Sequence, residues 1–426
     1  MPRGEKSAII TLVIEMKDNG IMGNLPEYMG EVGTEEPYSG YKFKVADVLT
    51  ITILGLICGL QNMKMIYQWT TTPRIKDFLR EKFGIVFIPK YVQFTNILGN
   101  VNPDELNKQF IKWAQNLVGE VCGKTISIDG KTIKSSVAKH GKKGAFHIVS
   151  AYVSELGLTI GQTMVEAKKN EIPAVQDLLE LLDISGAIVV ADALNCQKKT
   201  AKMIVEKGGD YLLSVKKNQG NLLDDVEAYF KLEPKKFEKI SKSEKNGGRI
   251  ERRTAWVCDD FEQTDEMKKW ADLCCIGVIK TEFETKKGKS EEFHYYISSA
   301  PLTVENLLKH ARLEWGVESM HWLLDVHFGE DKCLANERNT QFTLNILRKI
   351  VLNLLKVYKA KNGIKKPVSN IMAECLFDEK NIVPVLFAAL LEAFVTNITK
   401  LNSRVLRKLH GNLRKHRKTL VRGAKM

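Results

Sequence analysis

Two acidic residues of this sequence stand at the predicted ends of strands, where their carboxylates could hold the metal ions that phosphodiester chemistry requires. Asp129 follows a short β-branched run, Thr125–Ile128, and Asp192 follows the all-apolar run Ala187–Ala191. Carboxylates at strand ends suit Mg²⁺, because the sheet fixes their backbone while the side chains reach solvent, and Mg²⁺ prefers hard oxygen ligands. Two such ions about 3.5–4 Å apart can activate an attacking oxygen at phosphorus and neutralise the leaving one.

Each of these two acids also has a purely structural interpretation. Asp129-Gly130 after a strand is a common hairpin signal, and Asp192 could favour the positive end of a helix capped by Asn195. Taken singly, the structural interpretation is the better one for each acid. Both acids, however, end strands of one predicted sheet and have basic neighbours, which suits a site that holds metal and phosphate together. These neighbours are Lys124, Lys131, Lys134, Lys198 and Lys199.

A third carboxylate is expected from a helix that packs against the sheet. Glu314, Glu318 and Asp325 are spaced by four and seven residues, which places them on one stripe of a predicted helix. This periodicity does not choose among them. A solvated acidic stripe is the alternative, but Trp315 and Trp322 occupy a neighbouring stripe, so the helix is not simply exposed.

The composition is that of a globular protein with a polyanionic partner. The chain of 426 residues has 44% hydrophobic and 27% charged residues and a formal net charge of +13. This surplus favours nucleic acid or an anionic membrane face. Residues 401–426 are basic and contain no acidic residue, which is typical of either a DNA-binding tail or a solubilising tail.

The eight cysteines are scattered without zinc-like spacing, which predicts reduced thiols in the cytoplasm. The apolar run Val48–Leu60 is too short to span a membrane.

The elements that must position the acids follow from periodicity and caps. Helices are expected at Val45–Gln61, at Pro73–Phe83, and at Pro103–Val118 with Asn102 as its cap. A helical bundle is favoured over a helix-turn-helix unit. Strands in hairpin order then precede strands that alternate with helices, which predicts a mixed α/β sheet with the strand order of ribonuclease-H-like folds. These strands are Thr125–Ile128, His147–Val153, Leu158–Val165, Ala187–Ala191 and Tyr211–Val215.

The second half is predicted to be β-rich and then helical. Arg253–Val257, Cys274–Thr281 and Glu291–Ser298 alternate like antiparallel strands. One helix is expected over Val304–Phe328, with later helices at Thr340–Lys359 and near Val383–Val395. The predicted organisation is an N-terminal helical domain (1–119) with a possible role in binding DNA ends, a core in two parts (120–225 and 301–359), a β-rich insertion (226–300), and C-terminal helices with the basic tail (360–426).

Several runs of the sequence match one known family. They are Ile128-Asp129-Gly130-Lys131-Thr132, Asn170-Glu171-Ile172-Pro173-Ala174, Asp192-Ala193 with Cys196-Gln197, Lys207-Gly208-Gly209-Asp210-Tyr211, Lys217-Asn218-Gln219-Gly220, Gly248-Arg249-Ile250-Glu251, Tyr296-Ile297-Ser298-Ser299, and Trp315-Gly316-Val317-Glu318 continuing to Glu330-Asp331. Over roughly residues 45–356 the chain resembles the DDE-type insertion-sequence transposases of the H-repeat-associated group. The resemblance implies a ribonuclease-H-like core with Asp129, Asp192 and Glu318 as catalytic metal ligands, and it selects Glu318 over its neighbours.

The chain departs from the broader group in the residues around this glutamate. That group carries a Tyr and an Arg before the Glu and a Lys after it, whereas this chain has Ala311, Glu314 and Asp325. Gly247 stands where a His is usual. We therefore expect the basic clamp on the DNA end to come from elsewhere, with Arg312, Lys309 and Lys332 as candidates, and the strand-processing route stays open.

The expected function is Mg²⁺-dependent cleavage at transposon ends, with Mn²⁺ as a substitute, followed by strand transfer into target DNA. The expected partner is double-stranded DNA and no membrane, in a homodimer or larger synaptic complex within the bacterial cytoplasm, with the nucleoid. Two alternatives are a ribonuclease-H-like nuclease that cuts without joining and a catalytically silent DNA-binding relative. Candidate DNA contacts, for which a plain surface charge is the alternative, are Lys131, Lys216, Lys217, Asn218, Arg249, Arg252, Arg253 and Arg312.

Overall fold

The computed structural model describes residues 25–34, 43–134, 145–165, 170–246, 249–285, 288–333, 335 and 337–388. The basic tail expected at 401–426 lies outside these residues. Within them, no helix has the length and apolar character needed to cross a membrane.

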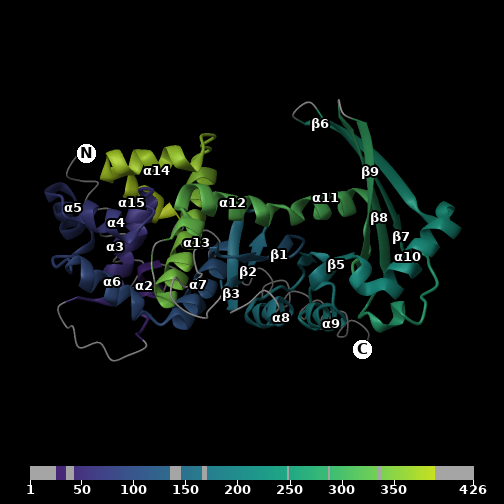
Figure 1. Cartoon of the computed structure of the whole chain (residues 1–426), viewed down its shortest axis with the longest axis horizontal. Coiled ribbons are helices and arrows are strands. Elements are labelled where there is room, and N and C mark those ends of the chain that lie inside the picture. Colours follow the sequence, from purple (N-terminus) through teal and green to yellow (C-terminus); the bar gives the residue numbers. More distant parts are fainter. Residues whose placement is uncertain are drawn as a thin grey trace, which may run out of the picture.

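The N-terminal helices form a bundle that is completed by helices from the other end of the chain. Apolar side chains of both sets share one core, and Figure 1 shows α14 and α15 beside the N-terminal helices, with α13 between them and the sheet. The N-terminal helices are α2 (Leu25–Gly30), α3 (Val45–Ile57), α4 (Met63–Thr70), α5 (Pro73–Phe83), α6 (Tyr91–Gly99) and α7 (Pro103–Val118). The C-terminal ones are α13 (Arg338–Lys361), α14 (Val368–Phe377) and α15 (Ile382–Leu386).

A nine-stranded sheet runs through the middle of the described structure, in the order β3-β2-β1-β4-β5-β9-β8-β7-β6. The pairs β1–β2 and β2–β3 are antiparallel, and the pairs β1–β4 and β4–β5 are parallel. The first five strands are β1 (Thr125–Thr132), β2 (His147–Val153), β3 (Leu158–Val165), β4 (Ile188–Ala191) and β5 (Asp210–Val215). The predicted mixed α/β sheet is thereby confirmed.

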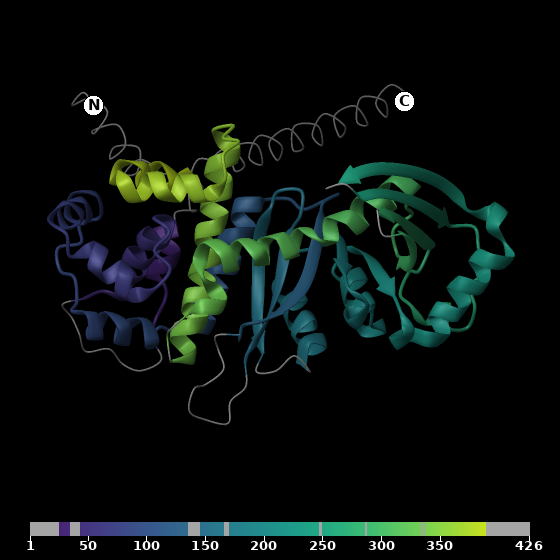
Figure 2. The ribbon, with the colours of Figure 1, turned by 45° about the horizontal axis from the view of Figure 1, so that its top comes forward.

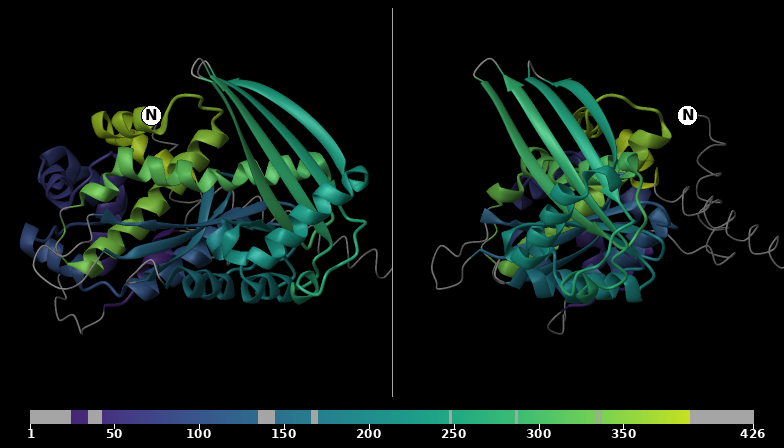
Figure 3. Two further views of the ribbon diagram at one scale, coloured as in Figure 1. Left: turned by 45° about the vertical axis from the view of Figure 1, so that its right-hand side comes forward. Right: turned by 90° about the vertical axis from the view of Figure 1, so that its right-hand side faces the viewer.

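The predicted β-rich insertion continues this sheet, because β9 pairs with β5 in antiparallel fashion. Its strands are β6 (Glu238–Asn246), β7 (Arg249–Cys258), β8 (Cys275–Thr285) and β9 (Gly288–Ser298). They are longer than predicted, and β6 was not predicted at all, since its sequence is almost entirely polar. Beyond the core the four strands project as a long curved blade (Figure 3).

Helices cover both faces of the first five strands. On one face lie α8 (Glu171–Leu181), α9 (Lys198–Glu206) and, beside the blade, α10 (Gly220–Leu232). On the other, α11 (Val304–Glu314) and α12 (Gly316–Phe328) run across the strands almost end to end (Figure 2). The single helix expected here is interrupted at Trp315. A Cβ on Gly316 would lie 3.2 Å from Ser154 Oγ and from a ring carbon of Tyr152, so glycine permits this close approach to the sheet.

Candidate active site

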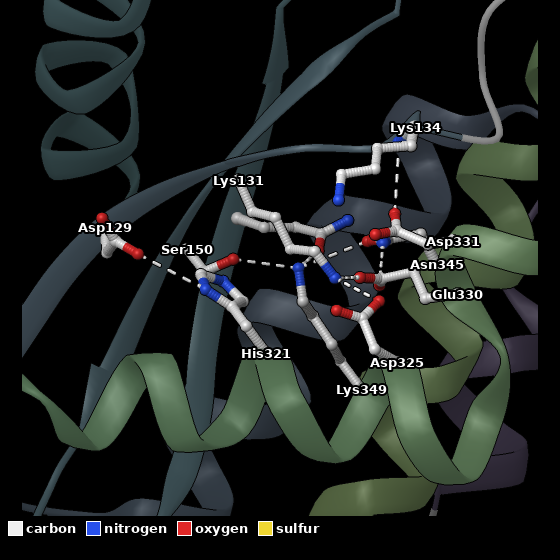
Figure 4. Close-up of polar contacts among 11 residues, drawn as sticks. Asp129, Lys131, Lys134, Ser150, His321, Asp325, Glu330, Asp331, Asn345 and Lys349 are labelled. Carbon is white, nitrogen blue, oxygen red and sulfur yellow. Dashed lines mark hydrogen bonds and ion pairs between the residues drawn. The ribbon is translucent and has the colours of Figure 1, made fainter.

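Asp129 lies inside a strand. The structure corrects the prediction that it ends one, because β1 continues for three residues and Gly130 pairs with Val149 of β2, which also excludes the hairpin turn. The carboxylate of Asp129 is on the face covered by α12, with Oδ2 3.4 Å from Nδ1 of the buried His321 (Figure 4). About a third of the side chain, 32%, is exposed, so the carboxylate is anchored and still accessible.

Asp192 follows β4 directly and neighbours Asp129. In the parallel pair of β1 and β4, Ile128 lies opposite Ala191, so the two acids succeed residues that are in register. Oδ1 of Asp192 accepts hydrogen bonds from the backbone N of Asn195 at 3.2 Å and from its Nδ2 at 3.0 Å. Burial, with the negative charges of Glu171 and Asp129, raises the pKa of Asp192 above its usual range, although the bonds from Asn195 act in the opposite direction.

The three acids of the helix stripe have different surroundings. Glu314, the last residue of α11, is half-buried, and burial together with the charges of Asp192 and Asp129 raises its pKa to about 7. Glu318, in the first turn of α12, is exposed to solvent. Asp325 pairs with the ammonium of Lys131 at 2.5 Å. Glu314 is thus electrostatically coupled to both aspartates, while Asp325 is committed to a lysine.

These acids do not form a closed metal cage. Among the residues that the structure describes, no group of three or more His, Cys, Asp or Glu side chains is arranged to hold a metal ion. What the arrangement provides is a concentration of carboxylates around Asp129, in which burial and neighbouring negative charges raise the pKa of Asp192 and of Glu314. A site of this kind has excess negative charge that a cation would relieve.

Behind Asp129 lies a buried ionic network that sequence reasoning missed (Figure 4). Lys131 also pairs with the buried Glu330 at 2.7 Å, and Glu330 accepts a hydrogen bond from Asn345 Nδ2 at 2.5 Å. Lys349 of α13 donates to Ser150 Oγ at 2.9 Å, and burial lowers its pKa to about 7. A sequence signal existed, since polar residues recur every fourth position, at 345, 349 and 353, on the buried side of α13.

On the opposite face, the structure corrects the role predicted for Asn195. We expected it to cap a helix, but α9 begins after Gln197. Asn195 is buried and donates from Nδ2 to Glu171 Oε1 at 2.9 Å. Glu171 is buried too, with Oε2 2.7 Å from Nε2 of His147. Burial alone would raise the pKa of Glu171, but the contacts with His147 and Asn195 lower it.

Several of the candidate DNA-contact residues already contact other residues of the protein. Lys131 is held by its two ion pairs, Arg253 pairs with Glu251 at 2.6 Å, and Arg312 pairs with Glu244 at 2.5 and 2.7 Å. The amide of Asn218 donates to Ala193 O at 2.6 Å, so this residue braces the turn after Asp192. Lys216, Lys217 and Arg252 are exposed, and Arg249 lies at the start of β7.

Comparison with known proteins identifies the family. The model of the transposase DDE domain matches residues 121–354, and that of a DDE_Tnp_1-associated domain matches residues 35–114. The chain is 35% identical over 330 residues to the "H repeat-associated putative transposase YhhI" of Escherichia coli K12, covering 74% of this chain and 87% of that protein. It is 33% identical over 364 residues to the "Putative transposase YncI" of Escherichia coli O157:H7, covering 80% and 90%.

Among solved structures, the chain is similar to the piggyBac transposase in a cryo-EM structure of its synaptic complex with hairpin DNA. The TM-score is 0.44 and the identity 11%, over 85% of this chain and 76% of that one. The two family models and the curated relatives agree with the resemblance seen in the sequence. The chain belongs to the DDE transposase family and is a DNA transposase.

Proposed function

We propose that this transposase cleaves DNA at the ends of its mobile element and joins the freed 3′-hydroxyl to target DNA, at a divalent-metal site formed by Asp129, Asp192 and Glu318. The observation that carries the proposal is the adjacent position of Asp129, within β1, and Asp192, directly after the parallel neighbouring strand β4, with the α11–α12 helices over the same strands. The strand order β3-β2-β1-β4-β5, with two antiparallel and two parallel pairs, supports a ribonuclease-H-like core.

The donor set fits a hard divalent cation. Carboxylate oxygens are the ligands that Mg²⁺ and Mn²⁺ prefer, and Mg²⁺ is commonly held by one or two carboxylates together with water and substrate phosphates. A preformed cage of three side chains is therefore not required. The raised pKa values of Asp192 and Glu314 support the fit, because burial and the negative charge of neighbouring carboxylates disfavour the ionised forms, which a bound cation would stabilise. Bound metal ions would supply activation of the attacking oxygen and neutralisation of the leaving one.

The chain's own residues would position the DNA backbone against this site. Lys216, exposed at the end of β5, is close enough to Glu314 to influence its pKa, which favours a role for Lys216 in holding a phosphate next to the carboxylates. Arg252 on β7 extends the basic surface along the blade. Such contacts are sequence-independent and fix the position of the duplex. We further propose that two copies or more assemble when two element ends are brought together.

The experiment is strand cleavage of DNA that carries the element's terminal repeats, with Mg²⁺ or Mn²⁺. We expect cleavage by the wild type and loss of it in Asp129→Asn, Asp192→Asn and Glu318→Gln, each of which keeps the shape of its side chain. Glu305→Gln, an exposed position at the other end of α11, is the matched control and should cleave normally. If all three variants cleave like the wild type, the assignment of the site is wrong.

The same assay separates the proposal from two other activities. A pre-cut substrate with a free 3′-hydroxyl should be joined to target DNA by the wild type, and cutting without joining would indicate a nuclease. Binding to the terminal repeats that weakens with salt, without cleavage under any divalent ion, would indicate a catalytically silent DNA-binding protein.

A further inference from the structure

A chain of buried polar side chains connects Asp192 to the far side of the sheet. Asp192 Oδ1 accepts from Asn195 Nδ2 at 3.0 Å, and the same nitrogen donates to Glu171 Oε1 at 2.9 Å. Glu171 Oε2 lies 2.7 Å from His147 Nε2, and Nδ1 of this imidazole is 3.0 Å from Thr132 Oγ1. The exposed fractions of His147, Glu171 and Asn195 are 1%, 3% and 1%, so water does not compete for these contacts.

The backbone beside Asp129 is shaped around the same chain. A Cβ on Gly130 would lie 2.2 Å from His147 Nε2 and 2.8 Å from the carboxylate of Glu171. Side chains alternate between the faces of a strand, so Asp129 points to one face while the space under Gly130 is filled by His147 and Glu171. The residue after Asp129 must therefore lack a side chain for this pair to fit.

A buried carboxylate at this position needs a function or a strong compensation, because burying a charge is costly. A neutral glutamine would cost less to bury, but it has one acceptor oxygen, which cannot replace both Oε1, the partner of Asn195 Nδ2, and Oε2, the partner of His147 Nε2. The carboxylate instead adds negative charge beside a site already rich in it, since Glu171 is one of the groups that raise the pKa of Asp192. Its compensation comes from His147 and Asn195, and the latter also contacts Asp192.

We propose that Glu171 is a positioning residue, which holds the amide of Asn195 so that this amide fixes the orientation of the Asp192 carboxylate, while His147 holds Glu171. Tying Oδ1 of Asp192 to Asn195 restricts rotation of the carboxylate about its Cβ–Cγ bond. Residues of this kind, which orient a metal ligand without touching the metal, typically change metal affinity by about 10–100-fold. The inference rests on the proposed role of Asp192 as a metal ligand.

The test measures Mn²⁺ binding by the full chain without DNA, by electron paramagnetic resonance of the free ion, with melting in EDTA as the measure of folding. Glu171→Gln and Asn195→Ala should each weaken Mn²⁺ binding by about 10–100-fold. The double variant should bind no more weakly than the weaker single one, because the two residues act through one another. Cleavage by Glu171→Gln should recover when Mn²⁺ is raised to saturation.

Glu155→Gln is the matched control. The carboxylate of Glu155 accepts hydrogen bonds from Thr125 N at 2.8 Å and from its Oγ1 at 2.7 Å, at the other end of β1 from the site. This variant should lose stability at most and bind Mn²⁺ like the wild type. A purely structural role of Glu171 would make its variant behave in the same way.

Two outcomes separate this inference from the proposed function. If Asp192→Asn loses Mn²⁺ binding while folded Glu171→Gln binds like the wild type, the positioning role is refuted and the metal site stands. If Asp192→Asn itself binds Mn²⁺ normally, the ligand assignment fails. Should Glu171→Gln not fold, Asn195→Ala decides, because it retains the pair of Glu171 and His147, and normal Mn²⁺ binding by this variant would overturn the inference.

Discussion

Removing the charge should have different effects at Glu314 and Glu318. At Glu314 it should raise the stability of the metal-free protein, and at Glu318 it should weaken metal binding and cleavage. Burial and the charges of two aspartates raise the pKa of Glu314 to about 7, from an ordinary value of 4.5. This change corresponds to an upper limit of roughly 3 kcal/mol against the ionised side chain in the metal-free protein, because partial exposure to solvent weakens the effect. Glu318 is exposed, so its carboxylate stays hydrated and its charge costs little in the metal-free protein.

The sign of the pH dependence follows from the raised pKa of Glu314. The folded protein keeps this proton to a higher pH than the unfolded chain, so the unfavourable contribution is absent below about pH 4.5 and fully present above about pH 7. Glu314→Gln should therefore gain stability relative to the wild type as pH rises through this window, by up to about 3 kcal/mol between pH 4.5 and pH 8. Urea unfolding in EDTA measures the difference, with Glu305→Gln as the control on the same helix.

Metal binding should depend on Glu318 and not on Glu314. A ligand that binds only the folded state stabilises it by about 2.7 kcal/mol at a hundred times its dissociation constant. Mn²⁺ should stabilise the wild type and Glu314→Gln, and should stabilise Glu318→Gln much less. Cleavage by Glu318→Gln should fall by at least about 100-fold, which corresponds to ~3 kcal/mol of lost transition-state stabilisation. If Glu314→Gln loses cleavage and Mn²⁺ binding while Glu318→Gln keeps both, Glu314 is the third ligand and our reasoning is refuted.

Three further predictions concern the surroundings of the site. Gly130→Ala should lose about 1–3 kcal/mol of stability through overpacking and should bind Mn²⁺ more weakly. Gly220→Ala, whose added Cβ has no neighbour within 4 Å, should be neutral. Equal stability of the two variants would contradict the close packing around Gly130. Lys349 has a pKa of about 7 in the folded protein, below its pKa in the unfolded chain. Its contribution to the free energy of unfolding should therefore rise with pH between about 7 and 10, by at most about 1.4 kcal/mol per pH unit. Urea unfolding of Lys349→Met should show a weaker dependence of stability on pH than the wild type. Arg252→Ala should reduce affinity for double-stranded DNA, and should reduce the slope of log K against log salt by about one. Lys268→Ala, on the short 3-10 helix Met267–Lys269 that follows β7, should change neither in the same titration.

Elements with local signals could be predicted from the sequence. Asn102 and Pro103 start α7, and the side chain of Asn102 accepts from the backbone N of Asp104 and Glu105. Thr303 caps α11 through a bond from Asn306 N at 3.2 Å. The apolar run before Asp192 forms β4, buried between β1 and β5. Each of these features depends on residues within one turn or one strand, which is the range over which a sequence pattern carries structural information.

Features that depend on distant partners could not be predicted. The polar half of β1, from Asp129 to Thr132, has no strand pattern and is held in the sheet by pairing with β2. Asn195 has the sequence context of a helix cap, but its amide binds Glu171, 24 residues earlier. The interruption at Trp315 follows from the close approach of Gly316 to the sheet, for which a glycine inside a helical pattern was the only signal.

The choice among the three acids of the helix stripe shows why spacing alone was insufficient. Asp325 is neutralised by Lys131, which stands two residues after Asp129 on β1 and approaches the helix from the sheet. Glu314, the last residue of α11, lies near the two aspartates, and burial together with their charges raises its pKa. Glu318 keeps an exposed carboxylate one turn further along. A ligand that must share its metal with the phosphate of a large substrate has to remain accessible, and Glu318 meets this requirement better than either neighbour. The resemblance and the geometry thus support the same residue for independent reasons, one from motif and the other from access.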